Sequence, residues 1–384
     1  MNSDNFESIE RKDNTMQFRP EKKFGFGLMR LPKLEDGSVD VKQTADMVDL
    51  FLANGFTYFD TAFVYEGSEE AIRKALVERY PRDSYTLATK MNGWMGCYDE
   101  ASCKAQFETS LERTGAGYFD YYLLHAIQEN NYTKYDEYHI WDYVKQLKEE
   151  GKVKHWGFSF HSNPERLEEL LTLHPDVDFV QLQINYKDWE DDNVQSRRNY
   201  EVCVKHNKPV VVMEPVKGGN LANPLPEINE IFKAYHPDLS PASWAIRFAA
   251  SLENVMVVLS GMSNLDQMKD NVSFMKDFTT LNEEEVAILD KARTIMNEVE
   301  TVPCTACHYC TEGCPMSIPI PDIFASYNVV LQYNDLATAK RRYDRLTKDR
   351  GKASNCIQCG QCEGACPQRI NVIERLKKAA EIFD

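Results

Sequence analysis

A repeated cysteine pattern near the C-terminus constrains this 384-residue chain more than any other feature. Eight of its 11 cysteines lie between residues 304 and 366, where the spacing C-x2-C-x2-C-x3-C-P occurs twice. The first 20 residues have no apolar core of the kind that directs export, and disulfide frameworks are typical of exported chains. The clustering therefore indicates metal binding. The two runs are Cys304, Cys307, Cys310, Cys314 and Cys356, Cys359, Cys362, Cys366.

This doubled spacing is the ferredoxin pattern for two 4Fe-4S clusters. It predicts that the first three cysteines of each run bind one cluster and that the fourth binds the other, so Cys366 completes the first set and Cys314 the second. Zinc is the alternative, because paired C-x2-C units also suit tetrahedral zinc. The three-plus-one form, with each run ending in proline, favours iron-sulfur clusters. The other cysteines are expected to be ordinary thiols: Cys97, Cys103 and Cys203.

The 41 residues between the two runs have a helical pattern from Ile323 to Lys348 and no alternation typical of strands. This region resembles the helical ferredoxin modules of the succinate dehydrogenase iron-sulfur subunit type. Its segment 340–352 has seven basic and two acidic residues. We expect this segment either to dock an acidic electron carrier, such as ferredoxin or flavodoxin, or to be a solvated helix face.

The overall charge excludes some classes of partner. The formal net charge is −16, and the first 299 residues alone, with 33 basic and 50 acidic side chains, carry −17. Nucleic-acid binding needs a basic surface, so no nucleic-acid partner is expected. No apolar run approaches the roughly 20 residues of a membrane-spanning helix, and we expect a cytoplasmic protein.

The first 280 residues alternate between apolar runs and segments with helical periodicity. Eight strands with intervening helices predict an α/β fold of the (β/α)8, or TIM, barrel type. An open doubly wound sheet is the competitor, but no G-x-G-x-x-G follows any of the runs. The runs begin at Phe24, Phe56, Tyr85, Asp120, Lys154, Phe179, Pro209 and Val255.

Polar residues stand where these strands are expected to end, which in such barrels is the face that carries the active site. Asp60, Lys90, His125 and Ser159 end four successive strands, and Tyr65 follows Asp60. A tyrosine could act as a general acid if a nearby ammonium lowered its pKa, and a histidine could donate a hydrogen bond to a substrate oxygen. Singly, each could be a cap, a solvated side chain or a core residue. Together they predict a proton-donating site.

Around these residues the sequence strongly resembles the aldo-keto reductase family. The matching segments are FDTAFVY (59–65), LATK (87–90), TSLERTGAGYFDYYLLHA (109–126), EEGKVKHWGFS (149–159), FVQLQINY (179–186) and GMSNLDQMKDN (261–271). The resemblance implies that Asp60, Tyr65, Lys90 and His125 are catalytic, with Tyr65 protonating a carbonyl oxygen as a nicotinamide delivers hydride. It also implies a set of cofactor-binding residues: Ser159, Gln181 and Asn185 for the nicotinamide carboxamide, Gly261 and Asn264 near the pyrophosphate or adenosine, and Asn271 near the adenine.

Some positions depart from the family pattern. The basic residues that would grip a 2′-phosphate align with Gly261 and Gln267, so NADPH or NADH is expected without a preference. Phe160 stands where the family commonly has asparagine, and Met213 where it commonly has the tyrosine that stacks on the nicotinamide. Hydride transfer moves two electrons together, whereas a 4Fe-4S cluster passes one at a time. FMN could link the two processes, but no motif in the sequence indicates an FMN site.

These observations predict three parts: a flexible segment at residues 1–20, an aldo-keto reductase barrel at 21–280, and a small, mostly helical 4Fe-4S domain at 281–384. The leading hypothesis is an oxidoreductase that reduces a small-molecule carbonyl, or oxidises an alcohol, with NAD(P)H. One alternative is a ferredoxin-linked reductase in which the clusters supply or remove single electrons, with or without a flavin. A second alternative is a redox sensor with structural clusters.

Overall fold

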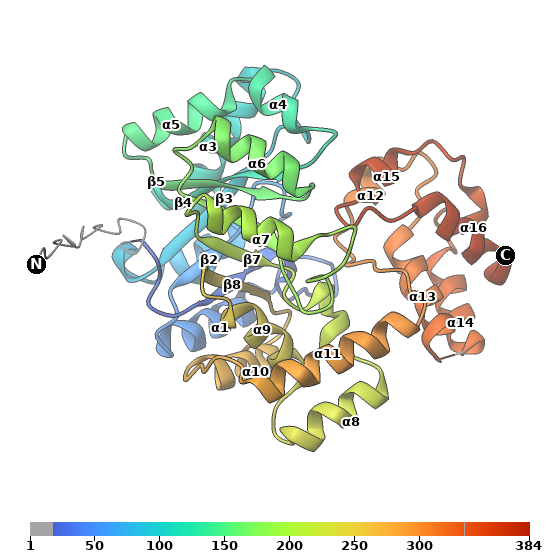
Figure 1. Cartoon of the computed structure of the whole chain (residues 1–384). Helices are drawn as coiled ribbons and strands as arrows, with labels where there is room; N and C mark the ends of the chain where they lie inside the picture. The colour runs from blue at the N-terminus through green and yellow to red at the C-terminus, as the bar shows by residue number, and fades with distance from the viewer. Residues whose placement is uncertain (1–17, 334) are drawn as a thin grey trace, which may run out of the picture.

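The computed structural model of the chain describes residues 18–333 and 335–384, and its first part is a closed barrel of eight parallel strands (Figure 1). The strands follow one another around the barrel in sequence order, and the last pairs with the first through Gly27 and Gly261. The predicted (β/α)8 barrel is therefore confirmed. The strands are β1 (Phe24–Gly27), β2 (Tyr58–Asp60), β3 (Thr86–Met91), β4 (Phe119–Ile127), β5 (Val153–Phe160), β6 (Phe179–Gln183), β7 (Val210–Met213) and β8 (Val255–Gly261).

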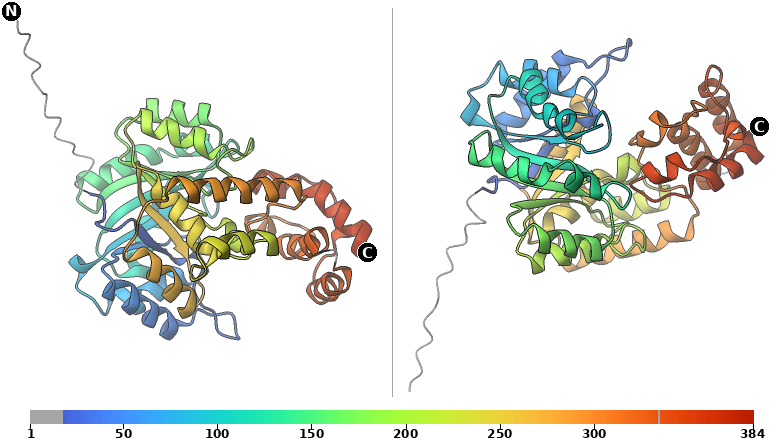
Figure 2. Two further views of the ribbon diagram at one scale, coloured as in Figure 1. Left: turned by 60° about the horizontal axis from the view of Figure 1, so that its bottom comes forward. Right: turned by 90° about the horizontal axis from the view of Figure 1, so that it is seen from above.

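Helices surround the barrel, and their apolar faces pack on the outer side of the strands (Figure 2). Several begin with a capping side chain, as at Asp40, Asp99 and Asn163, which accept hydrogen bonds from backbone amides of the first turn. The helices are α1 (Val41–Ala53), α2 (Ser68–Ile72), α3 (Glu100–Thr114), α4 (Tyr132–Glu137), α5 (Ile140–Glu149), α6 (Pro164–Leu173), α7 (Ser196–Lys205), α8 (Pro226–Tyr235), α9 (Pro241–Ser251), α10 (Leu265–Met275) and α11 (Glu283–Glu298).

The alternation of side chains along each strand explains which residues lie at the barrel mouth. Tyr58, Ala88 and Leu123 lie in the cluster that fills the barrel interior, whereas their neighbours Phe59, Leu87 and Leu124 pack outward against helices. Successive side chains of a strand point to opposite faces, so the residue two positions on faces the interior again, closer to the C-terminal end. These next inward residues are Asp60, Lys90 and His125.

The N-terminal end of the barrel is covered by the first residues that the structure describes. Phe18 stacks on His155 with ring centroids 4.5 Å apart, and its carbonyl accepts a hydrogen bond from the Tyr121 hydroxyl. Residues 18–20 therefore pack on the barrel. Residues 1–17 of the predicted flexible segment lie outside the described residues.

The C-terminal part is helical, as predicted, and has its own apolar core. The expected single helical stretch from Ile323 to Lys348 is two helices, because the Asp335 side chain accepts a hydrogen bond from the Thr338 amide and starts a new helix. The helices are α12 (Tyr309–Glu312), α13 (Ile320–Tyr333), α14 (Leu336–Leu346), α15 (Gln361–Ala365) and α16 (Val372–Phe383).

The helical domain stands beside the barrel, with α12 and α15 on the side nearest to it (Figures 1 and 2). Helix α11 packs on α8 through a cluster that includes Leu289, Ala292 and Phe232, and the chain then passes into the first cysteine run. The predicted division of the chain at residue 280 stays a prediction. In the part of the chain that the structure describes, no helix is long and apolar enough to cross a membrane.

Candidate active site

A cavity of about 590 Å³ lies at the C-terminal ends of the strands, between the barrel and the helical domain. The four residues with predicted catalytic roles, Asp60, Tyr65, Lys90 and His125, all border it, and we call them the mouth quartet. The structure thus brings together side chains from β2, β3, β4 and the loop after β2. Their catalytic roles are taken up below as a proposal.

Lys90 and Asp60 form a buried ion pair at the base of this cavity. The Nζ of Lys90 lies 2.5 Å from Asp60 Oδ1 and donates a second hydrogen bond to the Thr61 carbonyl at 2.7 Å. Both side chains are almost fully buried. Burial raises the pKa of Asp60 and lowers the pKa of Lys90, and the attraction between the two opposes both shifts. The pair therefore holds the lysine in a fixed position beneath Tyr65.

Tyr65 and His125 stand side by side above this ion pair. Lys90 Nζ lies 5.1 Å from the centroid of the Tyr65 ring, and the rings of Tyr65 and His125 meet edge to face at 5.6 Å. Burial, followed by the nearby Tyr309, Asp60 and Glu214, raises the pKa of Tyr65 well above its usual value. The lowered pKa that a general acid would need is not found in this structure, because desolvation dominates. Burial also lowers the pKa of His125, so its imidazole is neutral at pH 7.

Five of the six predicted cofactor-binding residues border the same cavity: Ser159, Gln181, Gly261, Asn264 and Asn271. Asn185 does not border it. Its amide nitrogen donates to Asp188 at 2.8 Å and to the Glu214 carbonyl at 3.1 Å, while its oxygen accepts from the Asp188 amide. The side chain of Asn185 is thus occupied in holding the loop after β6.

The polar atoms near the mouth quartet fit a carboxamide such as that of nicotinamide. Gln181 Oε1 is buried and has no hydrogen-bond partner. Ser159 Oγ accepts a hydrogen bond from the Ala126 amide at 2.7 Å, which leaves its own proton to donate. A carboxamide could therefore donate to Gln181 and accept from Ser159.

The other end of the cavity has little positive charge. Arg30 and Lys90 are the only basic residues among those described that border the cavity. Lys90 is held by Asp60, and Arg30 pairs with Glu214 at 3.5 Å and donates to the Thr305 carbonyl at 2.8 Å. Gln267 and Gly261 border the far end, as expected, and Lys269 pairs with Asp266 on the surface. Among the described residues that border the cavity, the guanidinium nearest to Gly261 is that of Arg30, whose side chain packs beside Gly261 and pairs with Glu214.

The structure sorts the eight clustered cysteines into two sets, each around a small apolar cavity. These sets match the predicted crossed arrangement, in which each run gives its fourth cysteine to the other set. Apolar side chains such as Phe324 and Ile370 line the first cavity, and Ile318 and Leu376 line the second. The first set is Cys304, Cys307, Cys310 and Cys366, and the second is Cys314, Cys356, Cys359 and Cys362.

The backbone repeats itself around both sets. Positive φ angles recur at equivalent positions of the two runs, and such turns bring backbone amides toward a common centre. Each set gathers four cysteines in the doubled three-plus-one order, which fits a 4Fe-4S cluster, in which each sulfur meets a different iron. The paired positions are Ala306 (+52°) with Gln358 (+59°), His308 (+65°) with Gly360 (+80°), and Ser317 (+51°) with Arg369 (+50°).

Of the other three cysteines, only Cys203 is the free thiol that was expected, because Cys97 and Cys103 are joined as a disulfide in the loop after β3. Their close approach follows from the turn into α3, which Asp99 caps. Their spacing of six residues does not match a recognised motif, so the pairing was missed from the sequence.

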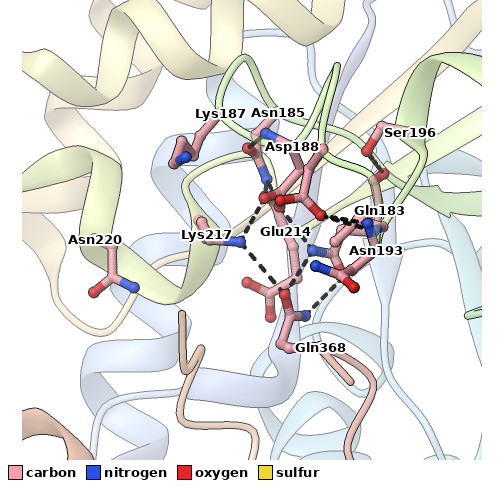
Figure 3. A network of polar contacts seen from close by, with 12 residues as sticks. Gln183, Asn185, Lys187, Asp188, Asn193, Ser196, Glu214, Lys217, Asn220 and Gln368 are labelled. Atoms are coloured by element: carbon pink, nitrogen blue, oxygen red, sulfur yellow. Dashed lines mark hydrogen bonds and ion pairs between the residues drawn. The ribbon is translucent and has the colours of Figure 1, made fainter. Parts of the chain in front are cut away.

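A buried polar network fixes the helical domain on the barrel (Figure 3). Gln368 and Gln183 exchange two hydrogen bonds of 2.8 and 2.9 Å between their amides. Lys217 pairs with Asp188 at 2.6 Å and reaches Gln368 at 3.4 Å. All four side chains are buried. The cation that pairs with Glu214 is Arg30, whereas the nearby Lys217 is bound to Asp188.

The sequence did not predict that several further residues would border the cavity. Cys307 and Tyr309 come from the first cysteine run, and Gln368 follows Cys366 by two residues. Arg30 follows β1 and contacts the cysteine run directly through Thr305. Their place in the site depends on how the two domains dock, which no local pattern reports.

Fold and site together define a class of barrel oxidoreductase with a cysteine-rich helical domain over its active face. Comparison with known proteins specifies the class: the chain belongs to the aldo/keto reductase family, whose profile matches residues 23–294. A second profile, described as a 4Fe-4S dicluster domain, matches residues 303–371.

Individual relatives are distant. The chain is 28% identical to a 9,11-endoperoxide prostaglandin H2 reductase of Trypanosoma cruzi, over 68% of this chain and 88% of that one. It is 29% identical to a probable aldo-keto reductase of Glycine max, over 44% of this chain and about half, 49%, of that one. An aldo/keto reductase structure from Klebsiella pneumoniae in complex with NADP and acetate has a TM-score of 0.58 at 22% identity, covering 70% of this chain and 90% of that one. This structural likeness shows the shared barrel fold.

Proposed function

We propose that the protein reduces the carbonyl group of a small molecule, or oxidises the corresponding alcohol, with a nicotinamide nucleotide. The observation that carries the proposal is that the mouth quartet borders one cavity together with Ser159 and Gln181. The family's tyrosine, lysine, aspartate and histidine thus meet free carboxamide partners at one place. The Klebsiella protein's NADP complex supports the same type of cofactor here.

A bound nicotinamide nucleotide would supply hydride to the carbonyl carbon. Tyr65 donates its hydroxyl proton to the carbonyl oxygen; because its raised pKa makes the buried phenol a weak acid, the transfer depends on stabilisation of the phenolate. The Lys90 ammonium, 5.1 Å from the Tyr65 ring, stabilises the phenolate that is left. Asp60 keeps Lys90 in place. Neutral His125 supplies a hydrogen bond at Nε2 to the oxygen where charge develops.

Phosphate recognition supports NADH as well as NADPH. The cavity's far end has Gly261 and Gln267 where a cation would bind a 2′-phosphate. Asn264 caps α10 by accepting from the Gln267 amide, and Asn271 donates to Ser260, so both are ordered before any nucleotide binds. A modest difference in affinity between the two nucleotides is therefore expected.

A second function is favoured by one further observation: Cys307 borders the same cavity as the mouth quartet. We propose that two 4Fe-4S clusters bound by the two cysteine sets supply or remove single electrons at this cavity, with a ferredoxin or flavodoxin as external carrier. Segment 340–352 is the proposed docking site, since Arg341, Lys348, Arg350 and Lys352 are exposed. FMN has no support from the residues that border the cavity.

One anaerobic experiment tests the first function and separates it from the second. The reconstituted protein is mixed with NADH or NADPH and a panel of carbonyl compounds, and nucleotide oxidation and the visible absorbance of the clusters are followed. Tyr65→Phe should lower kcat by about 10²- to 10⁴-fold and leave nucleotide binding unchanged. Tyr98→Phe, at an exposed position, is the control.

Unchanged turnover in Tyr65→Phe would show that the proton comes from elsewhere. Reduction of the clusters by ferredoxin, in a protein that binds neither nucleotide, would replace the first function by the second.

A further inference from the structure

The loop that carries the first three cysteines is attached to the barrel at several points. Arg30 donates to the Thr305 carbonyl at 2.8 Å, and Asn220 donates to the Cys304 carbonyl at 3.2 Å. Gly218 approaches the same loop so closely that a Cβ there would lie 2.4 Å from the Thr305 oxygen. These contacts hold residues 304–309 in one position over the barrel mouth.

This attachment places Tyr309 inside the site. The Tyr309 hydroxyl and His125 Nε2 are hydrogen-bonded at 3.3 Å. The ring of Tyr309 packs edge-on against Trp94 with centroids 5.6 Å apart, and its centroid lies 6.3 Å from that of His125. A residue between two cysteines of the helical domain thus stands beside the mouth quartet.

The occupied Nε2 has a direct consequence for any substrate. Under the proposed function, the carbonyl oxygen accepts a hydrogen bond from this nitrogen. An oxygen that does so must either displace the Tyr309 hydroxyl or bind beside it. The substrate touches Tyr309 in both cases.

We propose that Tyr309 is a substrate-binding residue supplied by the helical domain, and that it favours carbonyl groups attached to flat aromatic rings. This inference rests on the proposed function. The rings of Tyr309, His125 and Tyr65 border the cavity together, and Trp94 packs against the Tyr309 ring. Aromatic faces and edges stabilise a planar aromatic ligand more than a flexible aliphatic one. The barrel's substrate pocket is therefore complete only with the helical domain docked.

The test compares Tyr309→Phe and Tyr309→Ala in the anaerobic, cluster-containing protein, with benzaldehyde and propanal as probes. Tyr327→Phe is the matched control, because Tyr327 is buried in the core of the helical domain and does not border the cavity. Iron content and visible absorbance should be unchanged in all three. Tyr309→Phe should lower kcat/KM for both aldehydes by about three- to tenfold. Tyr309→Ala should lower it by about 10- to 100-fold for benzaldehyde and less than tenfold for propanal.

Benzaldehyde binding, followed by tryptophan fluorescence without nucleotide, gives a second readout and should weaken in Tyr309→Ala. A protein that binds benzaldehyde in this Tyr309-dependent way but does not reduce it would support this inference and refute the proposed function. Equal losses for the two aldehydes, or unchanged binding and turnover in Tyr309→Ala with iron retained, would overturn the inference.

Discussion

The contact between Gly218 and the first cysteine run predicts that one methyl group will loosen the helical domain from the barrel. Gly218 has φ +66° and no room for a Cβ, because Thr305 backbone atoms lie at 2.4 to 2.8 Å from its position. Gly151 has φ +73° and no atom within 4 Å of that position. Alanine is strained at both residues, but only Gly218→Ala also collides with the loop. Gly151→Ala is therefore a matched control.

The magnitude follows from what must move. A left-handed conformation costs alanine about 1–2 kcal/mol, and this applies to both variants. In Gly218→Ala the loop must shift by about 1 Å to restore ordinary contact, and the hydrogen bond from Arg30 to Thr305 is then lost. A hydrogen bond from a charged donor contributes about 1.5–3 kcal/mol. The free energy of unfolding should thus fall by about 2.5–5 kcal/mol in Gly218→Ala and by about 1–2 kcal/mol in Gly151→Ala.

Thermal unfolding and hydrogen exchange of the anaerobic protein measure this difference. With about 2.1 cal/mol/K of unfolding entropy per residue, 1 kcal/mol corresponds to a little over 1 °C for a chain of 384 residues. Gly218→Ala should therefore lower Tm by about 3–6 °C and Gly151→Ala by about 1–2.5 °C. Backbone amides of residues 304–310 should exchange faster only in Gly218→Ala. Equal Tm losses with unchanged exchange in this loop would refute the reasoning.

Three further predictions concern the barrel. Lys90→Met leaves the Asp60 carboxylate buried without its cation, which should cost about 3–5 kcal/mol of stability and lower Tm. The double variant Lys90→Met/Asp60→Asn should recover part of this loss. A Tm of Lys90→Met equal to that of the wild type would contradict the ion pair. Burial and Arg369 lower the pKa of His161 to about 4, so the unfolded chain binds a proton below pH ~6.5 that the folded protein does not. Stability should accordingly fall as pH drops from about 6.5 to 4, and Tm of His161→Gln should fall less over that window; parallel curves would exclude this residue as a cause. Gln267→Arg should tighten NADPH binding about tenfold and leave NADH binding unchanged, as measured by fluorescence titration; a similar gain for NADH would mean that residue 267 lies away from the 2′-phosphate.

The barrel and its inward-facing polar residues could be predicted because both follow from local patterns. The apolar runs that begin at Phe24 and Val255 are β1 and β8, and the period of two carries Asp60, Lys90 and His125 to the mouth. The crossed cysteine sets also followed from spacing alone, since it repeats in both runs.

The contacts between the domains could not be predicted in this way. In the sequence, Tyr309 is only a residue that lies between two cysteines. Its position beside His125 depends on the contacts that Arg30, Gly218 and Asn220 make with the cysteine loop. Burial likewise decided the direction of the Tyr65 pKa, which depends on the domain above it. Asn185 is the opposite case. It matches the family pattern in the sequence, but its side chain is hydrogen-bonded to Asp188 and Glu214.

The crossed cysteine sets also impose an order on biosynthesis. A ribosome makes the whole barrel and α11 before Cys304, and the set containing Cys304 stays incomplete until Cys366 follows 62 residues later. Because domains fold as units during synthesis, the barrel can fold while its mouth is still uncovered. Neither set has all four of its cysteines until Cys362 has been made. The cover over the barrel mouth is therefore completed only after the barrel that it covers.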